Sequence, residues 1–118
     1  MQVSKKRIKK SFEEKAYQFL YQTIADIKNA REAEVFLKDL LTKTEHLAVI
    51  KRLSAAYLLK KGKNYREIKD SLKISSATIS TIAEQLENGR GYQIALDKIQ
   101  ADEWAEKWSQ KIKRMFSV

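Results

Sequence analysis

The chain has 118 residues, which predicts a single domain, and its 24 Lys and Arg against 15 Asp and Glu give a net charge of +9. This charge favours polyanionic partners. Cysteine is absent, which excludes a disulfide framework, a thiolate metal site and a catalytic thiol, and the cytoplasm is the expected compartment. No segment is apolar for long enough to cross a bilayer, so no membrane partner is expected.

The composition also predicts an all-α fold. Proline is absent and glycine occurs three times. Helix interiors exclude both residue types, whereas β-proteins need them in turns. We expect residues 1–10 to form a flexible basic arm and residues 11–118 to form one helical domain of about six helices.

The first two predicted helices are amphipathic. One spans about residues 11–27, where Ser11 and Glu14 have the spacing of a capping box and apolar residues recur every three or four positions. The other runs from about Ala30 to Leu41 and has a shorter apolar face. Each helix is therefore expected to pack through one side.

The third predicted helix begins at a second capping box, which is formed by Thr42 and Glu45. Apolar residues lie nearly all round this helix, so we expect it to be central and buried on most sides. Its end is predicted at Lys60, Lys61 and Gly62, because cations and a glycine are favoured at helix C-termini.

Residues 64–88 have the pattern of a helix-turn-helix. Asn64 caps a short helix that ends at Leu72, a three-residue connection follows, and a second helix runs from Ser76 to Asn88. Two helices packed steeply across such a turn need apolar side chains at five particular offsets. The chain has one at each offset: Ile68, Leu72, Ile74, Ile79 and Ile82.

The helical period then predicts which side chains the second helix exposes. These side chains are small, which lets a helix backbone approach base edges in a DNA major groove: Ser75, Ser76, Ala77, Ser80 and Thr81. Residues 51–73 contain eight cations and two anions, and such a cluster can neutralise several phosphates. The cations expected near the exposed face include Lys61, Lys63, Arg66 and Lys69. We therefore expect sequence-specific binding to double-stranded DNA.

Other interpretations of the same residues stay open. Short amphipathic helix pairs are common, and Lys69 and Lys73 occupy positions where a helix-turn-helix more often has a small residue and a glycine. The basic surface would also suit a non-catalytic helical interaction module that meets an acidic protein. An RNA-binding protein is the third alternative.

Residues from about 36 to 86 resemble the Trp repressor family, in particular the Trp-repressor-like proteins of the YerC/YecD type. The matching stretches are LLTKTEHLAVIKRL at 40–53, LLKKG ending at Gly62, and YREIKDSLKISSATIS at 65–80. The resemblance implies a transcriptional repressor that forms an intertwined homodimer and places two reading heads in successive major grooves. It also implies that Arg66 matches a base-reading arginine. The resemblance implies DNA contact at five further positions: Lys69, Ser76, Ala77, Thr78 and Ser80.

The sequence matches the effector pocket of the family at two of three positions. In the Trp repressor, tryptophan lies between two arginines with a threonine nearby, and here Thr42 and Arg52 match the threonine and the first arginine. Thr81 occupies the position of the second arginine. The pocket then lacks one cation and one stacking face, so tryptophan is not the expected corepressor. Thr42 also suits a helix cap, and Arg52 suits a pair with a carboxylate.

Residues 92–116 predict one or two further helices. Trp104 and Trp108 are four positions apart, which favours a packed helix face or a dimer seam over a ligand-stacking platform. His46 has no second histidine or cysteine to join it in a metal or nucleophile site. We therefore expect no cofactor, no metal site and no enzymatic activity.

Overall fold

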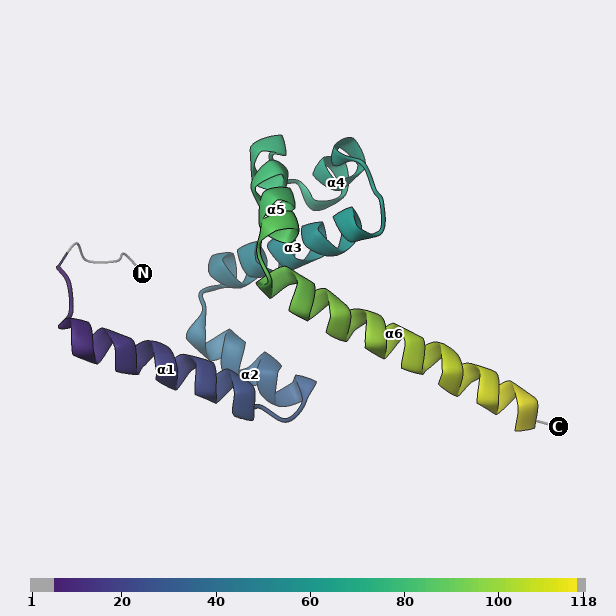
Figure 1. The fold of residues 1–118 in the computed structure, drawn as a ribbon, viewed down its shortest axis with the longest axis horizontal. Helices are drawn as coiled ribbons and strands as arrows, with labels where there is room; N and C mark the ends of the chain where they lie inside the picture. The colour runs from purple at the N-terminus through teal and green to yellow at the C-terminus, as the bar shows by residue number, and fades with distance from the viewer. Residues whose placement is uncertain (1–5, 117–118) are drawn as a thin grey trace. The chain divides into compact units, whose positions relative to one another are not determined.

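The protein is helical through most of residues 6–116, the part that its computed structural model describes. Six helices and no strand form there (Figure 1): α1 (Lys10–Asp26), α2 (Ala30–Leu40), α3 (Lys43–Lys60), α4 (Tyr65–Leu72), α5 (Ser76–Asn88) and α6 (Gly91–Phe116). The all-α prediction is confirmed. The chain divides into two compact units, residues 1–48 and 49–118, with the boundary inside α3.

The first unit contains α1, α2 and the start of α3. α1 begins at Lys10, so the capping position is Lys9, which makes no side-chain capping bond. The predicted capping box of Ser11 and Glu14 is therefore wrong. A capping side chain belongs to the residue just outside the helix, whereas Ser11 already lies within the first turn. Residues 1–5 of the predicted basic arm lie outside the described residues, and Lys10 is helical.

α2 has a cap that the sequence reasoning missed. The Asn29 side chain accepts a hydrogen bond from the backbone N–H of Glu32 at 2.9 Å. The Glu32 carboxylate in turn accepts one from the N–H of Lys28 at 3.0 Å. The signal is present in the sequence as an asparagine three residues before a glutamate, which is the spacing of a capping box.

Both predicted ends of α3 are confirmed. The Thr42 hydroxyl accepts from the N–H of Glu45 at 3.1 Å, and the Glu45 carboxylate accepts from the N–H of Thr42 at 2.9 Å. The second of these bonds lowers the pKa of Glu45. After the helix, Gly62 has φ +86° and its N–H donates to the carbonyl of Leu59 at 3.0 Å. Glycine adopts this left-handed conformation without a Cβ clash.

The expected burial of α3 on most sides is wrong for the single chain. Of its residues, Ala55 and Ala56 are buried. Four large aliphatic residues are 38–52% exposed: Leu47, Val49, Ile50 and Leu53. A helix that is apolar all round is buried only if other helices pack on every side of it. Within a single chain, other helices pack on the side of α3 that carries Ala55 and Ala56.

The core of the second unit lies where the end of α3 meets α4, α5 and α6. Its buried residues in the described part of the chain are at most 5% exposed: Ala55, Ala56, Ile68, Ile79, Ile82 and Leu96. Leu72 and Ile74 are partly buried against this cluster. The five residues predicted to join the two short helices therefore pack together, and we call them the wedge (Ile68, Leu72, Ile74, Ile79 and Ile82).

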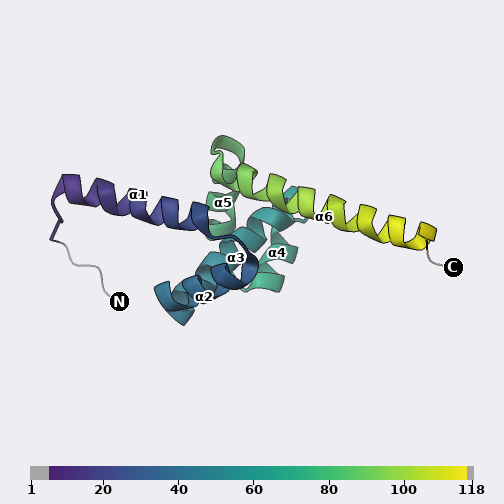
Figure 2. The same cartoon turned by 90° about the horizontal axis from the view of Figure 1, so that it is seen from below.

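α6 is one continuous helix of 26 residues, where the sequence left one or two open. Its first half packs on the core through Tyr92, Leu96 and Ile99. Figures 1 and 2 show its second half extending away from α3, α4 and α5 of the same unit. Trp104 and Trp108 lie on that second half and are 63% and 45% exposed.

Candidate nucleic-acid interface

The turn between α4 and α5 has the backbone shape that a helix-turn-helix requires. Lys73 follows α4 with φ 56° and ψ 51°, and its N–H donates to the carbonyl of Lys69 at 2.9 Å. Among the described residues other than glycine, Lys73 alone has a positive φ. This left-handed conformation explains why glycine is usual at the position, since a Cβ there costs about 1–2 kcal/mol.

Lys73→Gly is expected to raise the free energy of unfolding by about 1 kcal/mol, because glycine removes the strain and loses part of the gain through its own chain entropy. Urea unfolding followed by circular dichroism measures the change. Lys73→Ala is the matched control, since it removes the same charge and keeps the Cβ. If both variants gain the same stability, the effect comes from charge and not from the backbone.

The start of α5 is held by its own side chains. The Ser75 hydroxyl accepts from the N–H of Thr78 at 3.1 Å and lies 2.9 Å from the Thr78 hydroxyl. The Thr81 hydroxyl donates to the carbonyl of Ala77 at 3.1 Å. Three of the predicted DNA-contacting hydroxyls therefore already make local hydrogen bonds, and these bonds hold the first turns of α5 in place.

The side of α5 that is predicted to contact DNA, called the reading face from here on, is exposed. Ile79 and Ile82 point into the core, and the opposite side of α5 presents small side chains to solvent: Ser75, Ser76, Ala77, Ser80 and Thr81. Thr78 is half-buried. Because the side chains on the first two turns of this side are small, the helix backbone can come close to a groove floor there.

Exposed cations lie on the elements beside this face. Arg66 and Lys69 are exposed on α4, and Lys63 is exposed in the segment before it. α4 begins at the predicted cap, where the Asn64 side chain accepts from the N–H of Glu67 at 2.9 Å. Since α4 is held to α5 by the wedge, these cations and the reading face belong to one packed structure.

Lys61 differs from the other predicted DNA-binding cations. Its Nζ lies 3.2 Å from a carboxylate oxygen of Glu103 and 5.4 Å from the centre of the Tyr57 ring. The Tyr57 hydroxyl donates to the other Glu103 oxygen at 2.6 Å. These two hydrogen bonds lower the pKa of Glu103, and the Glu103 carboxylate raises the pKa of Lys61. The Lys61 charge is therefore partly compensated from α6, which the sequence did not indicate.

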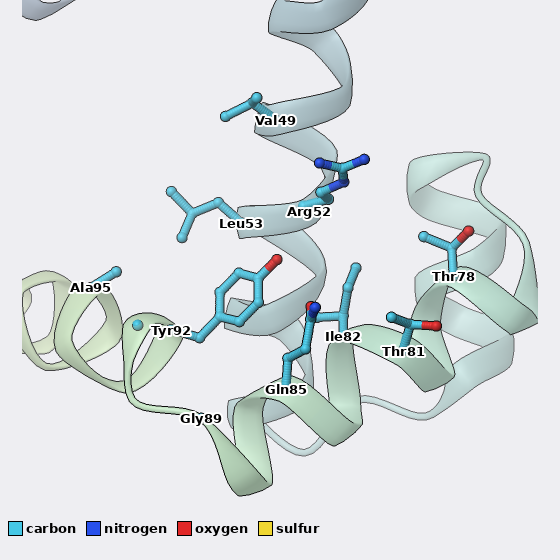
Figure 3. A pocket seen from close by; sticks show the side chains of 11 residues that line it. Val49, Arg52, Leu53, Thr78, Thr81, Ile82, Gln85, Gly89, Tyr92 and Ala95 are labelled. Atoms are coloured by element: carbon cyan, nitrogen blue, oxygen red, sulfur yellow. The ribbon is translucent and has the colours of Figure 1, made fainter. Parts of the chain in front are cut away.

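A cavity of about 940 Å³ lies beside α5, between the middle of α3 and the start of α6. Its walls include Arg52 and Thr81, so the structure brings together two of the three residues predicted for an effector pocket. Thr42 is not among the lining residues and makes the cap of α3 instead. Sequence reasoning missed Tyr92 and Gln85, which also line the cavity, and Figure 3 shows Tyr92 pointing into it from α6.

The described part of the chain has neither a metal-ion cluster nor a membrane-spanning helix. No group of three or more His, Cys, Asp or Glu side chains there could hold a metal ion. Within residues 6–116, no helix has both the length and the apolar composition needed to span a membrane.

Comparison with known proteins identifies relatives of the chain. The model of the Trp repressor protein family matches residues 15–100. The Bacillus subtilis protein YerC, described as uncharacterized, is 33% identical over 85 residues, which cover 71% of this chain and 82% of YerC.

Two solved structures are also similar. A TrpR-like protein from Eubacterium eligens matches with a TM-score of 0.68 and 30% identity, covering 73% of this chain and 90% of that one. A structure from Staphylococcus aureus matches with a TM-score of 0.67 and 31% identity, covering 72% and 86%. The predicted resemblance is confirmed by both kinds of comparison.

Proposed function

The chain belongs to the Trp repressor family, and from this we propose that it represses transcription by binding specific sequences in double-stranded DNA. The observation that supports this most is the exposed face of small residues on α5, held outward by the buried wedge next to exposed cations. A helix of this kind fits a major groove.

In this proposal the side chains divide into two roles. Lys63 and Lys69 contact phosphates, which supplies affinity without sequence preference. Arg66 contacts a base edge, and Ser76, Ala77 and Ser80 allow the close approach of α5. Lys61 exchanges its Glu103 partner for a phosphate, so it adds less affinity than a cation without such a carboxylate.

The protein binds DNA as an intertwined homodimer in this proposal. Large apolar residues of α1 and α3 are exposed in the single chain, at 38–71%: Phe12, Phe19, Ile24, Leu47, Ile50 and Leu53. Such surface is normally covered by another protein. Two copies related by a two-fold axis would place their α5 helices about one DNA turn, 34–36 Å, apart.

Tryptophan is not proposed as the effector. Among the described residues, Arg52 is the one cation on the cavity wall, and Thr81 supplies a hydroxyl that is already bonded to Ala77. Tyr92 points into the same space. An indole would therefore meet one guanidinium where two are needed to enclose both of its faces.

Binding to duplex DNA, duplex RNA and single strands, each titrated with salt, tests the proposed function. We expect the tightest binding to duplex DNA, with affinity falling as salt rises because counterions are released. Selection from random duplexes is expected to yield a two-fold symmetric consensus. Equal binding to all three polymers, or selection without enrichment, would favour RNA or an acidic protein as the partner of the basic surface.

A further inference from the structure

The exposed side of α5 changes character at the third turn of the helix. Its first two turns, residues 76–83, expose small side chains. Glu84 follows them, and its side chain is long, acidic and exposed. At about 100° per residue, Glu84 lies about 20° from the direction of Ala77 and about 40° from that of Ser80. Glu84 therefore extends the reading face by one turn and places a carboxylate on it.

α5 offers this carboxylate no partner of opposite charge. The helix contains no Lys or Arg. A helical side chain reaches the residues three and four positions away, which for Glu84 are Ser80, Thr81, Glu87 and Asn88. The ion pairs within residues 6–116 use the carboxylates of Glu34 and Glu103 instead. The structure thus leaves Glu84 without an ion-pair partner in this part of the chain.

Local rules also disfavour an acid at this position. α5 ends at Asn88, and its last turn carries no base. The C-terminal end of a helix is the negative end of its dipole, so acids near it destabilise the helix slightly. Glu84 and Glu87 also repel each other across three residues. Departures from local preference that the fold does not compensate are expected at functional sites.

A carboxylate on the reading face restricts which bases can lie opposite it. Phosphates on both edges of the groove repel it. The major groove offers two hydrogen-bond donors, the N4 amino group of cytosine and the N6 amino group of adenine. Adenine also presents its N7 acceptor beside the amino group, and this acceptor repels a carboxylate, whereas cytosine presents the donor alone. Cytosine is therefore the base that compensates this charge best.

We propose that Glu84 is a specificity-determining residue that accepts a hydrogen bond from the N4 amino group of one cytosine in each half-site. The inference rests on the proposed function. The small side chains of the first two turns let the start of α5 enter the groove, and the longer Glu84 side chain reaches its base from the third turn. Glu84 lies about 10 Å along α5 from Ala77, which corresponds to about three base pairs. The two residues therefore meet different bases.

Glu84→Gln tests this assignment, because it replaces the carboxylate by an amide of nearly the same size. Glutamine pairs with N6 and N7 of adenine. In selection from random duplexes, we expect the wild type to enrich cytosine at one position of each half-site and the variant to enrich adenine there. The ratio of the affinities for duplexes with cytosine and with adenine at this position is expected to change about tenfold in competition binding. The rest of the consensus is expected to stay unchanged.

Glu87→Gln is the matched control. It removes the same charge from α5, but Glu87 lies about 80° from Ala77 around the helix. We expect it to strengthen binding to all duplexes slightly and to leave the consensus unchanged. If Glu84→Gln has only this effect, or none, while the wild type still selects a sequence, the proposal is overturned and the proposed function stands. A wild type that selects no sequence would overturn the proposed function and this inference with it.

Discussion

Arg66→Ala is expected to reduce the discrimination between the selected DNA sequence and a non-specific duplex by about 5–150-fold, since a bidentate contact to a base is worth about 1–3 kcal/mol. Arg66 lies on the exposed side of α4, and the wedge holds α4 against the reading helix α5. Competition binding with the selected duplex and with variants of each base pair measures the loss. We expect the loss to be confined to one position in each half-site.

Lys63→Ala is the matched control for this prediction. It also removes one exposed cation, but a phosphate contact is equally available on every sequence. We therefore expect weaker binding to all duplexes and a slope of log affinity against log salt that is smaller by about one. If Arg66→Ala instead lowers affinity uniformly, Arg66 contacts phosphate and its assignment as a base-reading residue is wrong.

Ile68→Ala is expected to lower the free energy of unfolding by about 2–5 kcal/mol. The Ile68 side chain is 0% exposed and lies among the buried residues that join α3, α4, α5 and α6. Its removal leaves a cavity that closely packed neighbours fill poorly. Urea unfolding followed by circular dichroism measures the loss, and the destabilised wedge should also weaken DNA binding by loosening α4 from α5.

Ile8→Ala is the matched control, because Ile8 is 52% exposed and precedes α1. The same chemical change there is expected to cost less than about 0.5 kcal/mol. A small loss in Ile68→Ala, similar to that in the control, would contradict the role of the wedge as the element that positions α5.

The sequence was informative wherever a structure depends on neighbours within one or two turns. The capping box of Thr42 and Glu45, the glycine that ends α3 and the apolar offsets of the wedge are all local patterns. For Ser11 and Glu14 the same local rule was wrong, because α1 begins at Lys10 and encloses the serine. Spacing alone does not specify where the first helical turn starts.

In the candidate site, too, only the features that depend on nearby residues were predictable. The period of α5 was enough to place Ser76, Ala77 and Ser80 opposite the buried isoleucines. Partners distant in the sequence were not predictable. Lys61 and Glu103 are 42 positions apart and meet only because the first half of α6 packs beside the end of α3.

The sequence by itself therefore determined the helices, several of their caps and the face that α5 exposes, since each follows from backbone hydrogen bonds and side-chain periodicity within a few residues. Tertiary structure decided which apolar faces are covered. It left α3 half exposed, brought Arg52, Thr81 and Tyr92 to one cavity, and compensated the charge of Lys61. These features depend on which segments pack together, and no local pattern contains that information.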